Sequence, residues 1–267
     1  MREISLKEMQ QIELQLLIEL DRVCKKYDLR YFMDGGTLLG AMCYEGFIPW
    51  DDDIDIKMPR KDYEKLASLS KEFPSHISLD FPSRKHCEYT MGKLIDTRTI
   101  LIEGKKKTGV YIDILPMDGY PLDQTEWNSH LKALSRYNSL FHASLEGFAS
   151  LKKSSSLVSR IKGYVYSFMY TPYSLYKKLV SIAKKYDYDE SEFVGLLVEG
   201  NPEKERFEKS WLQLGFTLEF EGHFFPAPIE YKKHMEIFYG DHVTKEECYH
   251  NLPQYPSNHV HEVYWKD

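Results

Sequence analysis

Acidic side chains alternate with isoleucine in one short segment of the chain. Asp53 and Asp55 are interleaved with two apolar residues, Ile54 and Ile56. Alternate side chains of a β-strand point to the same face, so both carboxylates are expected to face one way. Neighbouring carboxylates repel each other unless a cation lies between them, and hard oxygen ligands suit Mg²⁺ or Mn²⁺. The segment therefore predicts a divalent-metal site.

A third carboxylate interrupts another apolar segment. Asp113 lies within 110–115, which has the pattern of a buried strand. A charge in such a strand is costly unless it is paired or coordinates a metal. If this strand lies beside the first, Asp53, Asp55 and Asp113 converge. Converging carboxylates can hold two metal ions roughly 3.5–4 Å apart for in-line displacement at phosphorus.

A glycine pair precedes the acidic segment. Gly35, Gly36 and Thr37 follow a strand candidate and begin a predicted short helix. Glycines allow the backbone to approach a phosphate closely, and a helix N-terminus offers free N–H groups. Lys93 and Arg98 are candidates for neutralising a diphosphate, although a solvated strand edge explains them equally well. An ordinary tight turn is the alternative explanation of the glycines.

The aspartates have three other interpretations. An EF-hand loop beginning at Asp51 requires glycine and glutamate where the chain has Ile56 and Asp62, so it is excluded. A metal-binding Asp-x-Asp site of a glycosyltransferase is chemically close, but it explains neither the glycine turn nor Asp113. A solvated acidic turn is harder to reconcile with the alternation of aspartate and isoleucine.

Hydrophobic periodicity predicts an α+β fold with two regions. Residues 1–145 are expected to form a catalytic core with a mixed sheet and flanking helices, and residues 146–267 a mostly helical, basic and aromatic region that completes the substrate site. Helices are predicted over 6–27, 37–44, 60–73, 126–145 and 229–239, and a helical, aromatic-rich region over 157–186 follows a possible linker at 152–156. Strands are predicted over 30–33, 54–58, 77–81, 89–96, 99–103, 110–115 and 216–220.

The net charge of -6 is unevenly distributed. Residues 147–186 contain no Asp or Glu and eight Lys or Arg, which gives +8 there and -6 - 8 = -14 elsewhere. This segment also carries many aromatic residues, so it suits an anionic membrane surface or an anionic glycan. A nucleic acid and a solvated basic helix face are the other interpretations. The N-terminus lacks a secretory pattern and the four cysteines show no pairing motif, so reduced thiols and a cytoplasmic location are expected.

Longer motifs resemble the LicD family of bacterial phosphocholine transferases, which also includes the fukutin-related proteins. They are Gly-Thr-Leu-Leu-Gly-Ala at 36–41, Gly-Phe-Ile-Pro-Trp-Asp-Asp-Asp-Ile-Asp-Ile at 46–56, Met-Pro-Arg-Lys-Asp-Tyr-Glu at 58–64 and Tyr-Ile-Asp-Ile-Leu-Pro-Met-Asp-Gly at 111–119. The match is dense from Tyr27 to Tyr120 and returns faintly at 238–241 and 252–253. The resemblance implies a nucleotidyltransferase-like core.

The same resemblance implies a metal-dependent transferase that moves phosphocholine from CDP-choline to a sugar hydroxyl and releases CMP. The acceptor is expected to be a teichoic acid precursor of the cell wall or a similar glycan such as lipopolysaccharide, carried on a polyprenyl diphosphate at the inner face of the membrane. Asp53 and Asp55 would bind Mg²⁺ or Mn²⁺, and Asp113 would be a third ligand and a candidate base for the acceptor hydroxyl. Gly35, Gly36 and Thr37 would hold phosphate. Nucleic acid is not an expected partner.

Related activities stay open. Other members transfer other polyol phosphates from CDP donors, a true nucleotidyltransferase would attack the α-phosphorus of an NTP, and an inactive relative would act as a scaffold in a wall-polymer complex. Family members often carry a basic residue where this chain has Cys43, so a phosphate contact from the short helix is expected to be missing. Trp50, Tyr111, Trp211 and Phe224 are candidates for binding the trimethylammonium head of choline.

Overall fold

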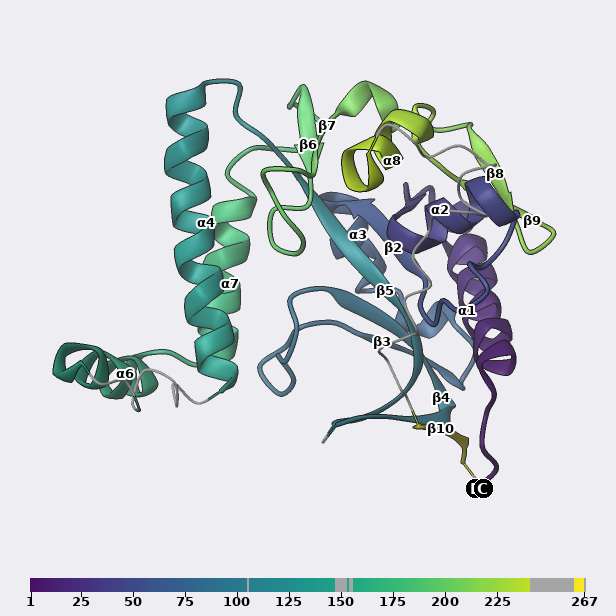
Figure 1. Ribbon diagram of the computed structural model, residues 1–267, viewed down its shortest axis with the longest axis horizontal. Helices are drawn as coiled ribbons and strands as arrows, with labels where there is room; N and C mark the ends of the chain where they lie inside the picture. The colour runs from purple at the N-terminus through teal and green to yellow at the C-terminus, as the bar shows by residue number, and fades with distance from the viewer. Residues whose placement is uncertain (105, 147–152, 154–155, 241–261, 267) are drawn as a thin grey trace. The chain divides into compact units, whose positions relative to one another are not determined.

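The computed structural model describes all residues except 105, 147–152, 154–155, 241–261 and 267. It combines helices with a mixed sheet, which confirms the α+β class (Figure 1). The chain divides into two compact units: the first comprises 1–80, 92–116 and 207–267, and the second comprises 81–91 and 117–206. The predicted division of roles at residue 145 stays a prediction.

The sheet of the first unit has the strand order β1-β2-β5-β4-β10. β3 pairs with β4 outside this path, and each pairing for which a register is defined is antiparallel. Lys93 of β4 lies opposite Asp113 of β5. The strands span Phe32–Met33 (β1), Asp55–Pro59 (β2), Ile77–Asp80 (β3), Gly92–Glu103 (β4), Lys106–Gly119 (β5) and Glu262–Trp265 (β10).

The predicted first helix is confirmed with its bounds, because α1 spans Leu6–Tyr27 and begins with the capping box of Ser5 and Glu8. Its residues Met9 and Ile12 pack in a core cluster with residues of β4, β5 and β10. The other helices and strands of this unit are α2 (Gly35–Tyr44), α3 (Arg60–Leu66), η1 (Ser70–Glu72), η2 (Lys209–Trp211), β8 (Thr217–Phe220), β9 (His223–Pro226) and α8 (Tyr231–Tyr239).

The second unit is built on two long helices that pack side by side, α4 (Gln124–Leu145) and α7 (Pro172–Ala183) (Figure 1). Trp127 and Leu134 of α4 form a buried cluster with Leu179 and Ala183 of α7. α6 (Leu157–Met169) precedes α7, and β6 (Phe193–Gly195) pairs with the last residues of β5 and with β7 (Arg206–Glu208). No helix among the described residues is long and apolar enough to cross a membrane.

Three expectations are corrected. β2 begins at Asp55, so Asp53 lies in the loop before the strand and not on it. The two strands predicted over 89–103 form the single strand β4, whose register with β5 shifts between Asp96 and Leu101. The helix predicted over 60–73 ends at Leu66, and η1 follows it.

The cysteines also differ from the expectation of reduced thiols. Cys43 is buried in α2 and is disulfide-bonded. Cys24 and Cys87 are free thiols. Cys248, the family-like residues at 241 and 252–253, and most of the basic stretch 147–155 lie outside the described residues.

Candidate functional site

β2 and β5 are neighbours in the sheet, so the two predicted acidic segments lie side by side. The backbone N–H of Asp113 donates a hydrogen bond to the carbonyl of Ile54 at 2.9 Å. Burial, followed by the charges of Asp53 and Asp113, raises the pKa of Asp55 well above its usual value. The three predicted carboxylates are therefore close enough to repel one another.

Two further aspartates enlarge this group. Oxygens of Asp51, Asp52 and Asp53 lie within 4.8 Å of one another, the kind of spacing from which carboxylates can share a cation. Burial and the charges of Asp53 and Asp52 raise the pKa of Asp51 to about 7. Negative charge thus accumulates in the loop before β2, and a divalent cation fits this set of oxygen ligands.

The glycine pair lies against these carboxylates. Gly35 has a φ of +51°, and a Cβ atom there would lie 3.0 Å from Asp55 Oδ2. A Cβ atom on Gly36 would lie 2.6 Å from Asp51 Oδ2, so a side chain at this position would displace the Asp51 carboxylate. Thr37 Oγ1 accepts a hydrogen bond from the backbone N–H of Asp55 at 2.9 Å. The start of α2 is thus fixed directly beside the acidic residues.

Asp34 is the N-cap residue of α2, but its side chain makes no capping hydrogen bond. Asp34 Oδ1 instead accepts a hydrogen bond from Lys57 Nζ at 2.8 Å, and it lies 2.8 Å from His234 Nε2. Lys57 and His234 are fully buried. Lys57 Nζ lies over the ring of Phe207, 4.6 Å from its centroid. The first N–H groups of a helix lack intrahelical acceptors. Because Asp34 does not cap them, they can bind an anion such as phosphate.

One of the two predicted basic residues lies at the carboxylates. Lys93 Nζ is 2.9 Å from Asp113 Oδ1 and 3.3 Å from the centroid of the Tyr111 ring. Burial raises the pKa of Asp113, and Lys93 acts in the opposite direction. Arg98 lies within the register shift of β4 between Asp96 and Leu101, where its guanidinium forms an ion pair with Asp96 at 2.5 Å. The donor-binding role of both residues stays a prediction.

Several residues of the site were not identified from the sequence. Glu13 of α1 is buried near the aspartates. The sequence pattern that could have identified it is the presence of a carboxylate on the apolar face of an amphipathic helix. Lys57 follows Asp53 and Asp55 at the same two-residue spacing. Tyr239 ends α8, and burial together with the charges of Asp51 and other aspartates raises its pKa to about 12. His234 had no signal of its own in the sequence.

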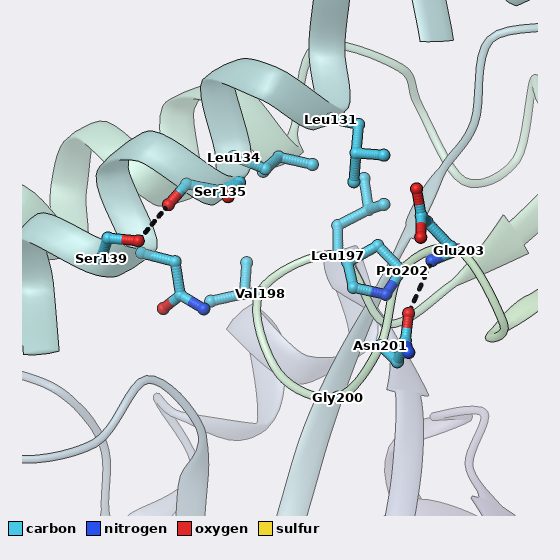
Figure 2. A pocket seen from close by; sticks show the side chains of 11 residues that line it. Leu131, Leu134, Ser135, Ser139, Leu197, Val198, Gly200, Asn201, Pro202 and Glu203 are labelled. Carbon is cyan, nitrogen blue, oxygen red and sulfur yellow. Dashed lines mark hydrogen bonds between the residues drawn. The ribbon is translucent and has the colours of Figure 1, made fainter. Parts of the chain in front are cut away.

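The second unit contains a separate cavity of about 310 Å³. Leu131, Leu134 and Ser135 of α4 line one side, and residues 197, 198 and 200–203 line the other (Figure 2). Asn138 of α4 is also a lining residue. The buried amide oxygen of Asn138 has no hydrogen-bond partner among the described residues. None of the predicted site residues lines this cavity.

The first unit thus combines a mixed sheet, a glycine turn at the start of α2 and acidic residues on adjacent strands. Residues 28–146 match the family described as LicD/FKTN/FKRP, nucleotidyltransferase domain. This part of the chain is therefore a LicD-family domain, as the motifs predicted.

The chain is similar in sequence to bacterial proteins of known and unknown function. The lipopolysaccharide cholinephosphotransferase LicD of Haemophilus influenzae is 28% identical over 273 residues, which cover 99% of each chain. An uncharacterised protein of Rickettsia prowazekii is 25% identical over 64% of this chain and 62% of its own length. An uncharacterised protein of Rickettsia typhi is 34% identical over 22% of this chain and 19% of its own length. Similarity to the Haemophilus enzyme thus extends over both units.

Proposed function

We propose that this protein transfers phosphocholine from CDP-choline to a hydroxyl group of a cell-surface glycan precursor, such as lipopolysaccharide or teichoic acid, and releases CMP. The observation that carries the proposal is the convergence of Asp55 and Asp113 from adjacent strands beside the Gly35–Gly36 turn. The full-length similarity to a lipopolysaccharide cholinephosphotransferase supports the choice of the transferred group.

In this reaction an acceptor hydroxyl oxygen forms a bond to the phosphorus that carries choline. The bond from that phosphorus to the bridging oxygen breaks, and CMP leaves with the electron pair. Gly35, Gly36 and Thr37 would bind phosphate oxygens through the N-terminal N–H groups of α2. Lys93 would offset negative charge on the diphosphate, and Asp113, which it contacts, would accept the proton of the hydroxyl.

Asp53, Asp55 and Asp113 would hold Mg²⁺ or Mn²⁺. The fit rests on the donor set, because carboxylate oxygens are the ligands that these ions prefer. The ion would neutralise charge on the diphosphate and on the departing CMP. Tyr111 and Tyr239, which both lie near the aspartates, are candidates for the face that binds the trimethylammonium group.

The proposal includes peripheral attachment to a membrane that carries the glycan acceptor. Its support is α6, whose exposed apolar side chains recur at helical spacing and form one face: Leu157, Val158, Ile161, Tyr164, Val165, Phe168 and Met169. Phe168 is 90% exposed. α6 and α7 together contain no acidic residue, so their basic side chains would complement anionic lipid headgroups.

The function is tested by following nucleotide release from a panel of donors. Purified protein would be incubated with Mg²⁺, a glycan acceptor and CDP-choline, CDP-ribitol, CDP-glycerol or CTP. We expect CMP from CDP-choline, in amounts equal to the phosphocholine transferred and lost on adding EDTA. Turnover with CDP-ribitol or CDP-glycerol alone would show that the donor is not CDP-choline. Release of diphosphate from CTP would show that the reaction is nucleotidyl transfer. No release from any donor by the folded protein would contradict the proposal.

A further inference from the structure

The second unit contains a further cavity, of about 520 Å³, whose charged lining residues are all basic: Arg84, Lys85 and Lys177. Within the part of the chain that the structure describes, no acidic side chain lines this cavity and none of the three cations forms an ion pair. Cys87 also lines it, and burial raises the pKa of its thiol to about 11, so the thiol is neutral near pH 7. Like charges around one cavity repel one another, and a bound anion would offset this repulsion.

A closed turn presents Arg84 and Lys85 together. The Ser83 backbone N–H donates a hydrogen bond to the carbonyl of His86 at 2.6 Å, and the His86 N–H donates one to Ser83 Oγ at 3.1 Å. The two basic residues lie between these ends, at the tip of the turn. An arginine side chain offers a planar fork of N–H donors that matches phosphate oxygens, and a lysine adds a point charge. The turn therefore offers donors suited to a phosphate group.

The start of α7 supplies the other basic lining residue. Lys177 Nζ lies 5.8 Å from the centroid of the Tyr173 ring, which also lines the cavity. The N–H of Ser174 donates a hydrogen bond to Thr171 Oγ1 at 3.2 Å, and Pro172 has no N–H to offer. The positive charge of the cavity therefore comes from side chains of two separate segments and not from the helix terminus.

One buried cluster anchors both this cavity and α6. Cys87, which follows the turn, and Tyr166 of α6 pack against the cluster of Phe141 and Leu175. α6 exposes the apolar face for which membrane attachment is proposed above. A cationic cavity and an exposed apolar helix on the same core suit an amphiphile whose phosphate group lies at the surface of a bilayer.

We propose that this cavity binds a phosphate or diphosphate group, carried by the lipid that bears the glycan acceptor. The inference deepens the proposed function and rests on it for the identity of the lipid. Arg84 and Lys85 would bind phosphate oxygens from the turn, and Lys177 would bind them from α7. The second unit would thereby select acceptors by their lipid-phosphate end. A free phosphate or diphosphate ion has the same chemistry, so the experiment separates the two sources.

The test measures sedimentation of the full chain with vesicles, in EDTA and without a donor. Phosphatidylcholine vesicles would carry either phosphatidic acid, whose phosphate is terminal, or phosphatidylglycerol, at matched surface charge. We expect the wild type to prefer phosphatidic acid, and Arg84→Gln/Lys85→Gln to lose the preference and to bind that lipid about tenfold more weakly. Lys132→Gln/Arg136→Gln removes the same two residue types from the exposed surface of α4, outside the cavity, and should keep the preference.

A second variant and a soluble ligand make the test decisive. Lys177→Gln alters the other lining segment and should reduce the preference in the same way. The free ion is tested by calorimetry with inorganic diphosphate in EDTA. Circular dichroism would confirm that each variant is folded.

A double variant, Arg84→Gln/Lys85→Gln, that keeps the preference for phosphatidic acid would overturn the inference. So would a wild type that prefers neither lipid and binds diphosphate no better than the double variant does. Diphosphate binding that only the double variant loses, without any lipid preference in the wild type, would assign the cavity to a free ion and refute the lipid as its source. Lost transfer by a protein that keeps the lipid preference would contradict the proposed function and not this site.

Discussion

Lys57 and Asp34 form an ion pair of 2.8 Å between two buried side chains, directly behind the start of α2. Burial acts to raise the pKa of Asp34, but Lys57 and His234 hold it well below its usual value. The pair connects β2, which carries Asp55, with the N-cap of α2, and His234 connects both to α8. We infer that it is a positioning device, because it keeps the Asp34 side chain away from the N–H groups that Asp34 would otherwise cap.

Lys57→Met should be strongly destabilising. Removing one member of a buried pair leaves the other charge without compensation, which typically costs about 3–5 kcal/mol. Urea unfolding followed by circular dichroism measures the change. Lys71→Met is the control, because Lys71 lies exposed in η1 and its replacement should change stability by less than about 0.5 kcal/mol. Equal stability of the two variants would show that the pair does not hold this region together.

His234 predicts acid sensitivity of the folded protein. Burial and the neighbouring charge of Lys57 lower its pKa from 6.5 to about 4. The unfolded chain therefore binds a proton at a pH where the folded chain does not, so stability falls as the pH drops from 6.5 towards 4. The loss attributable to His234 is roughly 3 kcal/mol over this window.

This sensitivity is checked by urea unfolding at several pH values between 7 and 4.5. His234→Gln cannot titrate, so its stability should change less over the window than that of the wild type. His223→Gln replaces an exposed histidine of β9 and should retain the wild-type slope. If the free energy of unfolding of His234→Gln falls with pH as steeply as that of the wild type, the acid sensitivity comes from other groups.

Lys93 and Arg98 should differ in their effect on turnover. Lys93 contacts Asp113, whereas the Arg98 guanidinium is bound by Asp96 and lies 5.6 Å from the Trp265 ring. A hydrogen bond from Lys93 to the charged diphosphate would contribute about 1.5–3 kcal/mol, so Lys93→Met should lower kcat/KM by roughly tenfold to 100-fold. Arg98→Met should lower it less. Initial rates of CMP release decide this, and a larger effect of Arg98→Met would contradict the assignment.

The exposed face of α6 predicts binding to anionic vesicles. Phe168→Ser should weaken sedimentation with vesicles that contain phosphatidylglycerol, because it removes a large apolar side chain from the face that would enter the interface. Charge reversal at Lys177 and Lys178 should also weaken it, and added salt should act in the same direction. Leu214→Ser removes an exposed apolar side chain of the first unit and serves as the control. No binding of the wild type to anionic vesicles would contradict membrane attachment.

Local patterns predicted the helices and strands more reliably than the partners of individual side chains. α1 follows from its capping box and its apolar spacing, and the β2 and β5 segments follow from apolar residues around Asp55 and Asp113. The register shift that joins two predicted strands into β4 depends on pairing with β5, which the sequence of β4 alone does not encode. Asp53 fell outside β2 because the chain approaches that strand as a loop.

Long-range contacts account for what the sequence did not reveal at the site. Asp34 and His234 are 200 residues apart in the chain, and Gln10 reaches the carbonyl of Asp51 only because α1 packs beside the loop before β2. A carboxylate on the apolar face of α1 was visible in the sequence, but periodicity alone does not say what it faces. Lys57 shares the alternation of Asp53 and Asp55, which indicates its face but not its partner.

The central claim is that the aspartates at β2 and β5 support transfer of phosphocholine. Its most direct test compares wild type, Asp53→Asn and Asp55→Asn for Mg²⁺-dependent transfer of labelled phosphocholine from CDP-choline to a glycan acceptor, with circular dichroism to confirm that each variant is folded. We predict one CMP for each phosphocholine transferred by the wild type, and a loss of about 100-fold to 1,000-fold in either folded variant, the range seen when a group that stabilises transition-state charge is removed. Transfer by folded Asp53→Asn at the wild-type rate would contradict this account.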